Sequence, residues 1–460
     1  MNTGYMKLPD NIYIVLCMLR DAGYSSYVVG GCCRDYILGL QPNDYDVATS
    51  ATPEQTLDVF KDFKTIPTGI KHGTITVMIG DTHVECTTFR LDGEYTDKRR
   101  PDGVAFLSNI EDDLMRRDFC MNAIAYNPWD GFIDPFDGIK DIGNRVVRCV
   151  GRAENRFKED GLRILRAMRF AAQLGFEIEE ETSNAIHSHK HLLNNISKER
   201  IQSELCKILM SRLGGNKILD EYSDVLCQII PEIEPMIGFD PKDRWNCYDV
   251  WEHTMKSMNG LYLGDKENAD IVTRLALLFH DIGKPHCEEK YDEQGFRTYE
   301  DNPQISAKMA YRILRDLKFS NEIVGYVTQL ISYRCTSFED YLSIADLKRL
   351  LNKLGEKQLL RLLFLEECNV NRGMSLILTQ NRRRCAIDAA QYDARNIIED
   401  GACYSLKQLA IKGDDLIELG VTQGKEVGIL LEKLLDMVIE GNVNNNKHEL
   451  IKMAEEIIGG

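Results

Sequence analysis

Two patterns of apolar positions divide the chain. Up to about residue 150, short runs rich in β-branched residues are bounded by glycine or charged turns, as at 25–30, 74–80 and 83–89. This pattern predicts β-strands. From about residue 150 nearly to the C-terminus, apolar residues such as Leu162 and Leu165 recur at helical spacing, which predicts amphipathic helices. We therefore expect an N-terminal α/β or α+β head followed by a nearly all-helical remainder.

The length of the chain indicates several domains. Its 460 residues are about three times the size of a typical domain. Stretches containing glycine and asparagine are the expected joints, and they lie at 213–216, 237–247, 259–269 and 441–447. We expect a multidomain protein with four regions, at 1–150, 151–235, 236–350 and 351–460.

The charge balance restricts how the protein could bind nucleic acid. The chain has 56 basic and 72 acidic residues, a net charge of −16, which argues against binding through the whole surface. From Arg90 to Phe170, however, there are 15 basic and 15 acidic residues, so all of the acidic excess lies elsewhere. We expect a local site for a polyanion in this neutral segment, and we do not expect DNA as a partner.

The composition also bears on the compartment. No apolar run approaches the roughly 18–20 residues of a membrane span, and the N-terminal sequence lacks the layout of a signal peptide. Fourteen cysteines are scattered singly, apart from adjacent Cys32 and Cys33, and they form no CxxC pair. We expect a cytoplasmic protein with reduced thiols and no membrane partner.

A glycine pair is the first candidate for ligand binding. Gly30 and Gly31 end the run at 25–30 and begin a predicted helix. Glycine lets the backbone approach a ligand closely, and a helix N-terminus presents unpaired N–H groups to phosphate. Arg34, one turn into the helix, could bind the same phosphate. Because glycine pairs are common in turns, this feature alone is a weak signal.

Two carboxylates follow at a spacing of two residues. On an extended segment, Asp44 and Asp46 project to the same face. Their charges repel unless a cation lies between them, and hard oxygen ligands suit Mg²⁺. The alternative is a solvated acidic turn, and for an isolated DxD pattern that alternative is the favoured interpretation.

In combination these features resemble a known family. The glycine pair, Arg34, the two aspartates and the sequence ATSATP at 48–53 are similar to the signature of polymerase-β-like nucleotidyltransferases. The class II group contains bacterial tRNA CCA-adding enzymes and poly(A) polymerases. The resemblance implies that Asp44 and Asp46 hold two Mg²⁺ ions that activate an RNA 3′-hydroxyl and neutralise the departing pyrophosphate. Glu85 is the candidate third carboxylate, with an outward-facing strand residue as the alternative.

The block at 113–123 resembles the segment of that family that binds the ribose and phosphates of the incoming nucleotide. The resemblance assigns this role to Arg117, Asp118 and Asn122. Cys120 stands where the family usually has threonine, and a thiol is a weaker hydrogen-bond donor than a hydroxyl. We therefore expect the choice of ribose to depend on the other three residues. Without the resemblance, the arginines and aspartate would be an ordinary surface ion-pair cluster.

The stretch at 90–101 is polar and contains glycine, as ordinary loops do. It resembles the flexible loop of relatives that add all three nucleotides. Its presence favours full CCA addition.

The segment at 156–170 is helical in pattern, with arginines on one polar strip. Alone, it would be a solvated face tied by an ion pair four residues apart. It resembles the EDxxR block of the family, however, which implies nucleotide-binding roles for Glu159, Asp160, Arg163, Arg166 and Arg169. Asp160 and Arg163 would select the base, since a carboxylate accepts from the amino group shared by C and A, whereas U and G should be refused.

Within that block, Glu159 would orient Arg163, and Arg166 and Arg169 would contact the nucleotide and position the helix. A further block at 196–204 also resembles the family, and we expect it to be structural.

Two later blocks resemble an HD domain, the helical fold of metal-dependent phosphohydrolases. His253, His280 and Asp281 are its candidate metal ligands. Relatives often carry two more histidines, where this chain has Asn302 and the pair Tyr333-Arg334, and none of these side chains is a comfortable replacement for an imidazole ligand. We expect a retained scaffold with little or no hydrolase activity.

The C-terminal region has weaker signals. Three consecutive arginines at 382–384 are typical of a solvated helix face. The glycines and aspartates at 413–424 resemble the body and tail that contact the tRNA elbow in the family.

The resemblance as a whole implies a template-independent nucleotidyltransferase that adds C, C and A to tRNA 3′ ends from CTP and ATP. Its regions would be a polymerase-β-like catalytic head (1–150), a neck with the nucleotide-selecting helix (151–235), an HD-like domain (236–350) and a tRNA-binding body and tail (351–460). A poly(A) polymerase or an A-adding enzyme is the alternative within the same chemistry. An HD phosphohydrolase or an RNA-binding regulator is less favoured, because every head motif is present and the HD motif is the damaged one.

Overall fold

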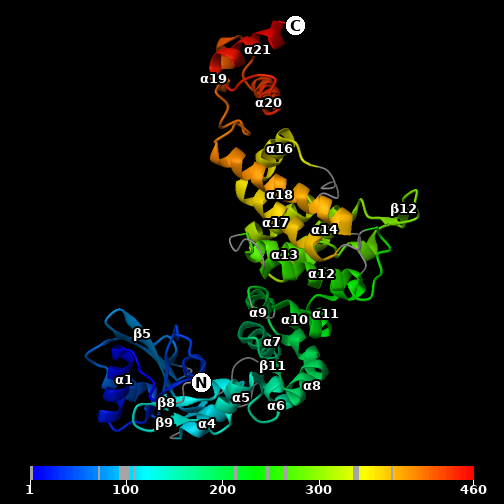
Figure 1. Ribbon diagram of the computed structural model, residues 1–460. Coiled ribbons are helices and arrows are strands. Elements are labelled where there is room, and N and C mark those ends of the chain that lie inside the picture. Colours follow the sequence, from blue (N-terminus) through cyan, green and yellow to red (C-terminus); the bar gives the residue numbers. More distant parts are fainter. Residues whose placement is uncertain are drawn as a thin grey trace. The chain divides into compact units, whose positions relative to one another are not determined.

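The structure is a computed structural model. It describes residues 4–70, 73–92, 104–106, 109–211, 215–244, 248–262, 268–334, 341–373 and 377–459. The chain forms two compact units, Met1–Pro231 and Glu232–Gly460 (Figure 1). This division does not test the four-part organisation expected from the sequence, which stays a prediction.

A seven-stranded mixed sheet forms the head. Its strands lie in the order β3-β4-β5-β2-β1-β8-β9. Their bounds are β1 Ser26–Val29, β2 Asp46–Thr49, β3 Lys64–Ile66, β4 Thr74–Ile79, β5 Thr82–Thr88, β8 Ala125–Asn127 and β9 Gly131–Ile133. The strands predicted at 25–30, 74–80 and 83–89 are confirmed as β1, β4 and β5. Neighbours are antiparallel except β2 and β5, which run parallel.

Short helices accompany this sheet: α1 Asp10–Asp21, α2 Gly31–Ile37, α3 Pro53–Val59, α4 Ile110–Met115, the 3-10 helix η2 Cys120–Asn122 and α5 Gly138–Asn144. A separate pair of strands joins β6 Arg90–Asp92 to β7 Val104–Phe106. Every residue of β1 is buried, because apolar side chains cover both of its faces. This buried strand fixes the turn that follows it.

Helices complete the first unit: α6 Ala153–Glu159, α7 Leu162–Leu174, α8 Glu180–His189, η3 Lys190–Asn195, α9 Lys198–Leu209, α10 Gly215–Glu221 and α11 Ser223–Ile229. The pattern at 156–170 predicted one continuous helix, but the structure has two helices there. Asp160 adopts an extended conformation (φ −146°, ψ 106°) and separates α6 from α7. Its carboxylate accepts a hydrogen bond from the N–H of Leu162 at 3.0 Å and so caps the second helix.

The second unit is helical. Its helices are α12 Val250–Asn259, η5 Gly260–Tyr262, α13 Ile271–Phe279, η6 Lys284–His286, α14 Asn302–Asp316, α15 Asn321–Ser332, α16 Ile344–Leu354, α17 Glu356–Gly373, α18 Ile377–Glu399, α19 Gly413–Glu418, α20 Lys425–Ile439 and α21 Lys447–Gly459. The 3-10 helix η4 (Pro231–Met236) lies at the boundary between the units. None of the described helices has both the length and the apolar composition that a membrane span requires.

The expectation of a nearly all-helical remainder is confirmed. Two short strand pairs interrupt the helices: β10 Val146–Val147 with β11 Glu177–Ile178, and β12 Lys290–Tyr291 with β13 Arg297–Thr298. These two-residue strands are too short to give a periodic signal. The long helices α12, α13 and α17 pack together, while α19 to α21 surround a core of their own around Leu416, Leu434 and Leu450.

Candidate active site

The turn after β1 brings together two blocks that are far apart in the sequence. Gly30 has a φ of +78° and caps the N-terminus of α2. A Cβ atom at this position would lie 3.0 Å from Nη1 of Arg117. Both the left-handed backbone and the close guanidinium therefore require glycine here. The predicted glycine turn and the predicted sugar block are thus neighbours.

The predicted carboxylates lie on or next to two paired strands. Asp46 begins β2, and the parallel register pairs Val47 with Cys86 of β5. Asp46 and Glu85 precede this pair by one position each, so they share the opposite, exposed face, and Asp44 is exposed two residues earlier. The three do not belong to a group of ligand atoms within 4.8 Å of one another. The three carboxylates therefore share an exposed face without forming a compact set of ligand atoms.

The electrostatic environment of Asp46 is suited to a cation. Partial desolvation by surrounding protein atoms raises the pKa of Asp46, Arg117 opposes the rise, and the carboxylate of Asp44 adds to it. All three donors are hard oxygens, the type that Mg²⁺ prefers. Within the described residues, no hydrogen bond or ion pair occupies the carboxylates of Asp44, Asp46 and Glu85. The donor set therefore fits divalent magnesium.

A chain of hydrogen bonds connects the other predicted residues of the head. Arg34 donates from Nη1 to Oδ1 of Asn122 at 2.8 Å, and Asn122 donates from Nδ2 to Asp118 at 3.4 Å. Asp118, only 8% exposed, accepts from Nε of Arg166 at 2.8 Å and also pairs with its Nη2. The structure thus links the glycine turn, the sugar block and the segment expected to select the base.

Asp118 is charged in this network. Burial is the largest influence and would raise its pKa, but Arg166, Arg163 and the hydrogen bond from Asn122 together hold the pKa below its usual value. The carboxylate also accepts from the backbone N–H of Phe119 at 2.9 Å. Asp118 is therefore a fixed anchor for Arg166.

Phe170 is a part of the site that the sequence did not reveal. The centre of its ring lies 5.3 Å from the guanidinium carbon of Arg34, 5.5 Å from that of Arg166 and 4.2 Å from that of Arg169. Phe119 packs against the same ring edge-on at 5.8 Å. Cation–π attraction at these distances holds the three arginines around one aromatic side chain. Phe170 lies three residues beyond Ala167 on the buried face of α7, and this apolar spacing by itself indicates a residue of the hydrophobic core.

The carboxylate of Asp160 is held by an unforeseen residue. Arg200 of α9 donates to its two oxygens at 2.6 and 3.3 Å. The same helix supplies Glu204, which pairs with Arg169 at 3.1 Å. The block at 196–204 therefore contacts two of the predicted nucleotide-binding residues. In the sequence, the alternating basic and acidic residues of this block were the feature that could have indicated these ion pairs.

Arg163 is buried, at 9% exposed, and lies beside several acceptors. It pairs with Glu159 and donates to the backbone carbonyls of Arg156 at 3.0 Å and Arg116 at 3.3 Å. The predicted contact of Glu159 with Arg163 is thus present in the structure. A solvated arginine strip, the simpler interpretation of the pattern, does not describe Arg163 or Arg169, because both are buried.

Cys120 has no access to a nucleotide. Its Sγ donates to the carbonyl of Cys149 at 3.3 Å, and burial raises the pKa of the thiol to about 12. The thiol is therefore neutral and part of the core. No disulfide joins the cysteines in the described part of the chain. The loop expected at 90–101 lies outside the described residues from 93 onward.

A second group of predicted residues meets in the other unit. His253, His280 and Asp281 form the one set of three His, Cys, Asp or Glu, among the described residues, whose ligand atoms lie within 4.8 Å of one another. All three are buried. Burial lowers the pKa of His253 to about 4 and that of His280 to about 3, so both imidazoles are neutral at pH 7.

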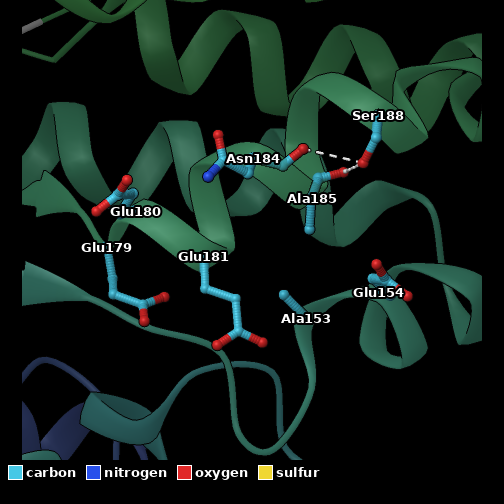
Figure 2. Close-up of a pocket in the computed structure, with 8 residues that line it drawn as sticks. All are labelled: Ala153, Glu154, Glu179, Glu180, Glu181, Asn184, Ala185 and Ser188. Atoms are coloured by element: carbon cyan, nitrogen blue, oxygen red, sulfur yellow. Dashed lines mark hydrogen bonds between the residues drawn. The ribbon is translucent and has the colours of Figure 1, made fainter.

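A separate pocket of about 580 Å³ lies beside α6 and α8, and none of the predicted site residues lines it. Figure 2 shows its lining, with the carboxylates of Glu154, Glu179, Glu180 and Glu181 around it. This concentration of negative charge disfavours nucleotide phosphates. The pocket therefore does not compete with the head as the nucleotide site.

Three family models match the chain. They are "Poly A polymerase head domain" at residues 26–148, "Probable RNA and SrmB- binding site of polymerase A" at 175–236 and "tRNA nucleotidyltransferase domain 2 putative" at 301–454. The first match spans the strands, the glycine turn and the carboxylates described above. The third match covers the region from α14 to α21.

Relatives and solved structures match nearly the whole chain. A CCA-adding enzyme of Levilactobacillus brevis is 45% identical over 95% of each chain, and one of Ligilactobacillus salivarius is 32% identical over 98% of each. The CCA-adding enzyme of Bacillus stearothermophilus in complex with CTP is similar at a TM-score of 0.72, with 28% identity, over 99% of this chain and 98% of that one.

The CCA-adding enzyme of Thermotoga maritima complexed with tRNA_CCA matches at a TM-score of 0.66 and 21% identity, over 98% of this chain and 96% of the other, which shows the shared fold. Identity and coverage of the curated relatives, together with the head model, exceed what a shared fold alone would produce. The chain belongs to the family of CCA-adding enzymes, which are nucleotidyltransferases.

Proposed function

We propose that this protein adds C, C and A to the 3′ end of tRNA from CTP and ATP, with release of pyrophosphate. The observation that supports this most is the continuous chain from Arg34 through Asn122 and Asp118 to Arg166. It connects the phosphate, sugar and base blocks into one nucleotide-sized site. Similar enzymes have been solved in complex with CTP, with ATP and with tRNA.

Asp44, Asp46 and Glu85 would hold two Mg²⁺ ions on the exposed face shared by the start of β2 and the middle of β5. When bound there, the metal supplies positive charge for the triphosphate and the RNA 3′-hydroxyl. Arg117, beside the glycine turn, would bind phosphate oxygens next to these carboxylates. Arg34 is already oriented by Asn122 and would do the same from the other side of the turn.

Base selection would use Asp160 and Arg163. Arg200 occupies part of the Asp160 carboxylate, but a carboxylate has about four acceptor sites, so it can also accept from the amino group of C or A. Arg163, fixed by Glu159, would donate to a ring acceptor. Because the protein supplies both partners, no nucleic-acid template is needed. The helical second unit would bind the body of the tRNA, and the protein would act in the cytoplasm, where thiols stay reduced.

Primer extension on three tRNAs tests the proposal. The tRNAs end before CCA, after CC and after CCA, and each is incubated with CTP alone, ATP alone and both. We expect two C additions to the first with CTP alone, one A addition to the second with ATP alone, and none to the third. Failure to add C to the shortest tRNA would instead support an A-adding enzyme or a poly(A) polymerase.

A further inference from the structure

The buried cluster around Asp281 is built from residues in or next to five helical segments of the second unit. His253 comes from α12, His280 and Asp281 follow α13, and Asn302 begins α14. Arg334 follows α15, and Lys284 begins η6. His253, His280 and Asp281 have the donor atoms of a metal site. Whether a metal fits depends on what else contacts those atoms.

Both oxygens of Asp281 lie beside cations of the chain, although Oδ2 accepts no hydrogen bond and also lies 3.7 Å from Nε2 of His253 and 3.5 Å from Nε2 of His280. Oδ1 pairs with the guanidinium of Arg334 and accepts from Nδ2 of Asn302 at 2.9 Å. Oδ2 lies 3.1 Å from Nζ of Lys284. Arg334 is further fixed by donating to the carbonyl of His280 at 3.2 Å. Two cations of the chain therefore stand where a divalent ion would have to approach the carboxylate.

The imidazoles are also turned toward each other. The two Nε2 atoms of His253 and His280 lie 3.3 Å apart, and Nδ1 of His280 lies 2.6 Å from the carbonyl of Leu277, where it must donate. Nε2 of His280 is then an acceptor, and His253 can donate to it. This contact uses the lone pair that His280 would offer to a metal.

The charges of the cluster balance without a metal. The described acids in contact are Asp243, Asp281 and Glu366, and the described bases are Lys284, Arg334 and Arg383. Arg383 belongs to the run at 382–384 that the sequence indicated was solvated, and it is buried 3.8 Å from Glu366, while its two neighbours are exposed. A divalent ion would add two uncompensated positive charges to this buried space, at a large desolvation cost.

We infer that this cluster takes no metal ion, and that Arg334 and Lys284 supply from within the chain the positive charge that balances Asp281. The HD-like motif is thereby a structural tie between α12, α13, α14, α15, α17 and α18. It has no part in phosphoester hydrolysis. This inference does not depend on the proposed nucleotide addition.

Metal content gives the first test. The full-length protein and its His253→Gln variant are dialysed against Zn²⁺ and, separately, Mn²⁺, and bound metal per chain is measured by atomic emission. The carboxylates of the head are the same in both proteins, so the difference reports on the cluster alone. We expect equal metal content. One additional equivalent in the wild type would overturn the inference.

Thermal unfolding gives the second test, through Arg334→Met, Asp281→Asn and the double variant. Each single change leaves a buried charge without its partner and should lower Tm by roughly 10 °C. The double variant should lose clearly less than the sum of the two, because both members of the pair are removed together. Additive losses would contradict the pairing. If one of these variants fails to fold, the difference in metal content between the wild type and His253→Gln still decides.

Discussion

Each of the two units contains a buried network in which an aspartate pairs with an arginine. The two networks differ in whether carboxylates near them stay exposed. In the head, Asp118 pairs with Arg166, and the network extends toward carboxylates that stay exposed at Asp44 and Asp46. In the second unit, Asp281 pairs with Arg334 and Lys284, so each of its buried carboxylate oxygens lies beside a cation of the chain. The comparison shows that motif residues predict chemistry only where their ligand atoms remain available.

The largest loss of activity is expected at the exposed carboxylates of the head. Asp44→Ala and Asp46→Ala should each lower nucleotide incorporation by roughly 1,000-fold or more, because the carboxylates that hold the metal are lost. Both residues are exposed, so Tm should remain within a few degrees of the wild type. Single-turnover CTP incorporation and circular dichroism measure the two quantities. Glu54→Ala, an exposed acid in the first turn of α3, is the matched control. Near-normal activity of either aspartate variant would refute the metal assignment.

Next in size is the effect of breaking the anchor in the head. Asp118→Asn removes the charge that fixes Arg166, and a hydrogen bond to a charged group contributes about 1.5–3 kcal/mol. We therefore expect kcat/KM for CTP and ATP to fall roughly 10- to 100-fold, with a moderate loss of Tm. In the other network, Asp281→Asn should lower Tm with no change in kcat/KM per folded molecule. The comparison would fail if both substitutions changed activity to the same extent.

A smaller effect is expected at the base-selecting residues. Arg200→Ala frees Asp160 from its partner on α9, and Arg163→Ala removes the proposed donor to the base. Each should lower the preference for CTP over UTP by about 10-fold. Competition between the two nucleotides in one reaction measures this ratio. Lys207→Ala, a half-exposed cation on the same helix as Arg200, should leave the ratio unchanged. Unchanged selectivity in Arg163→Ala would count against protein-supplied base selection.

The smallest effect concerns the aromatic side chain. Phe170→Leu keeps an apolar side chain but removes the ring that contacts Arg34, Arg166 and Arg169. Each cation–π contact contributes about 0.5–2 kcal/mol, so we expect KM for nucleotides to rise a few-fold while kcat changes less. Phe170→Tyr retains the ring and should restore KM. A lower Tm without any change in KM would show that Phe170 contributes to stability and not to nucleotide binding.

Strands and candidate site residues of the head were predictable from the sequence, but the contacts between those residues were not. The β-branched runs gave β1, β4 and β5, because strand signals are local. The glycine turn, Asp118 and Asn122 were each identified by motif, and the structure joins them. That the chain Arg34–Asn122–Asp118–Arg166 would be continuous could not be predicted, because the pairing depends on the tertiary arrangement of three segments.

Other features were not accessible for identifiable reasons. The break at Asp160 keeps the helical spacing of its neighbours, so apolar periodicity does not detect it. Arg383 was expected on a solvated helix face, and its burial beside Glu366 depends on a partner 17 residues away. The ion pair of Arg200 with Asp160 joins residues 40 positions apart, so local sequence did not reveal it either. Arg334 was noted as a lost histidine. Its ion pair with Asp281 became visible only in three dimensions.

One measurement tests the central claim most directly, that the open network of the head selects and adds nucleotides. A tRNA lacking CCA is incubated with all four nucleoside triphosphates at equal concentration, and the added 3′ sequence is determined. The account predicts three nucleotides, C, C and A, with no U or G. A product without C, or with U or G incorporated as readily as C and A, would contradict it.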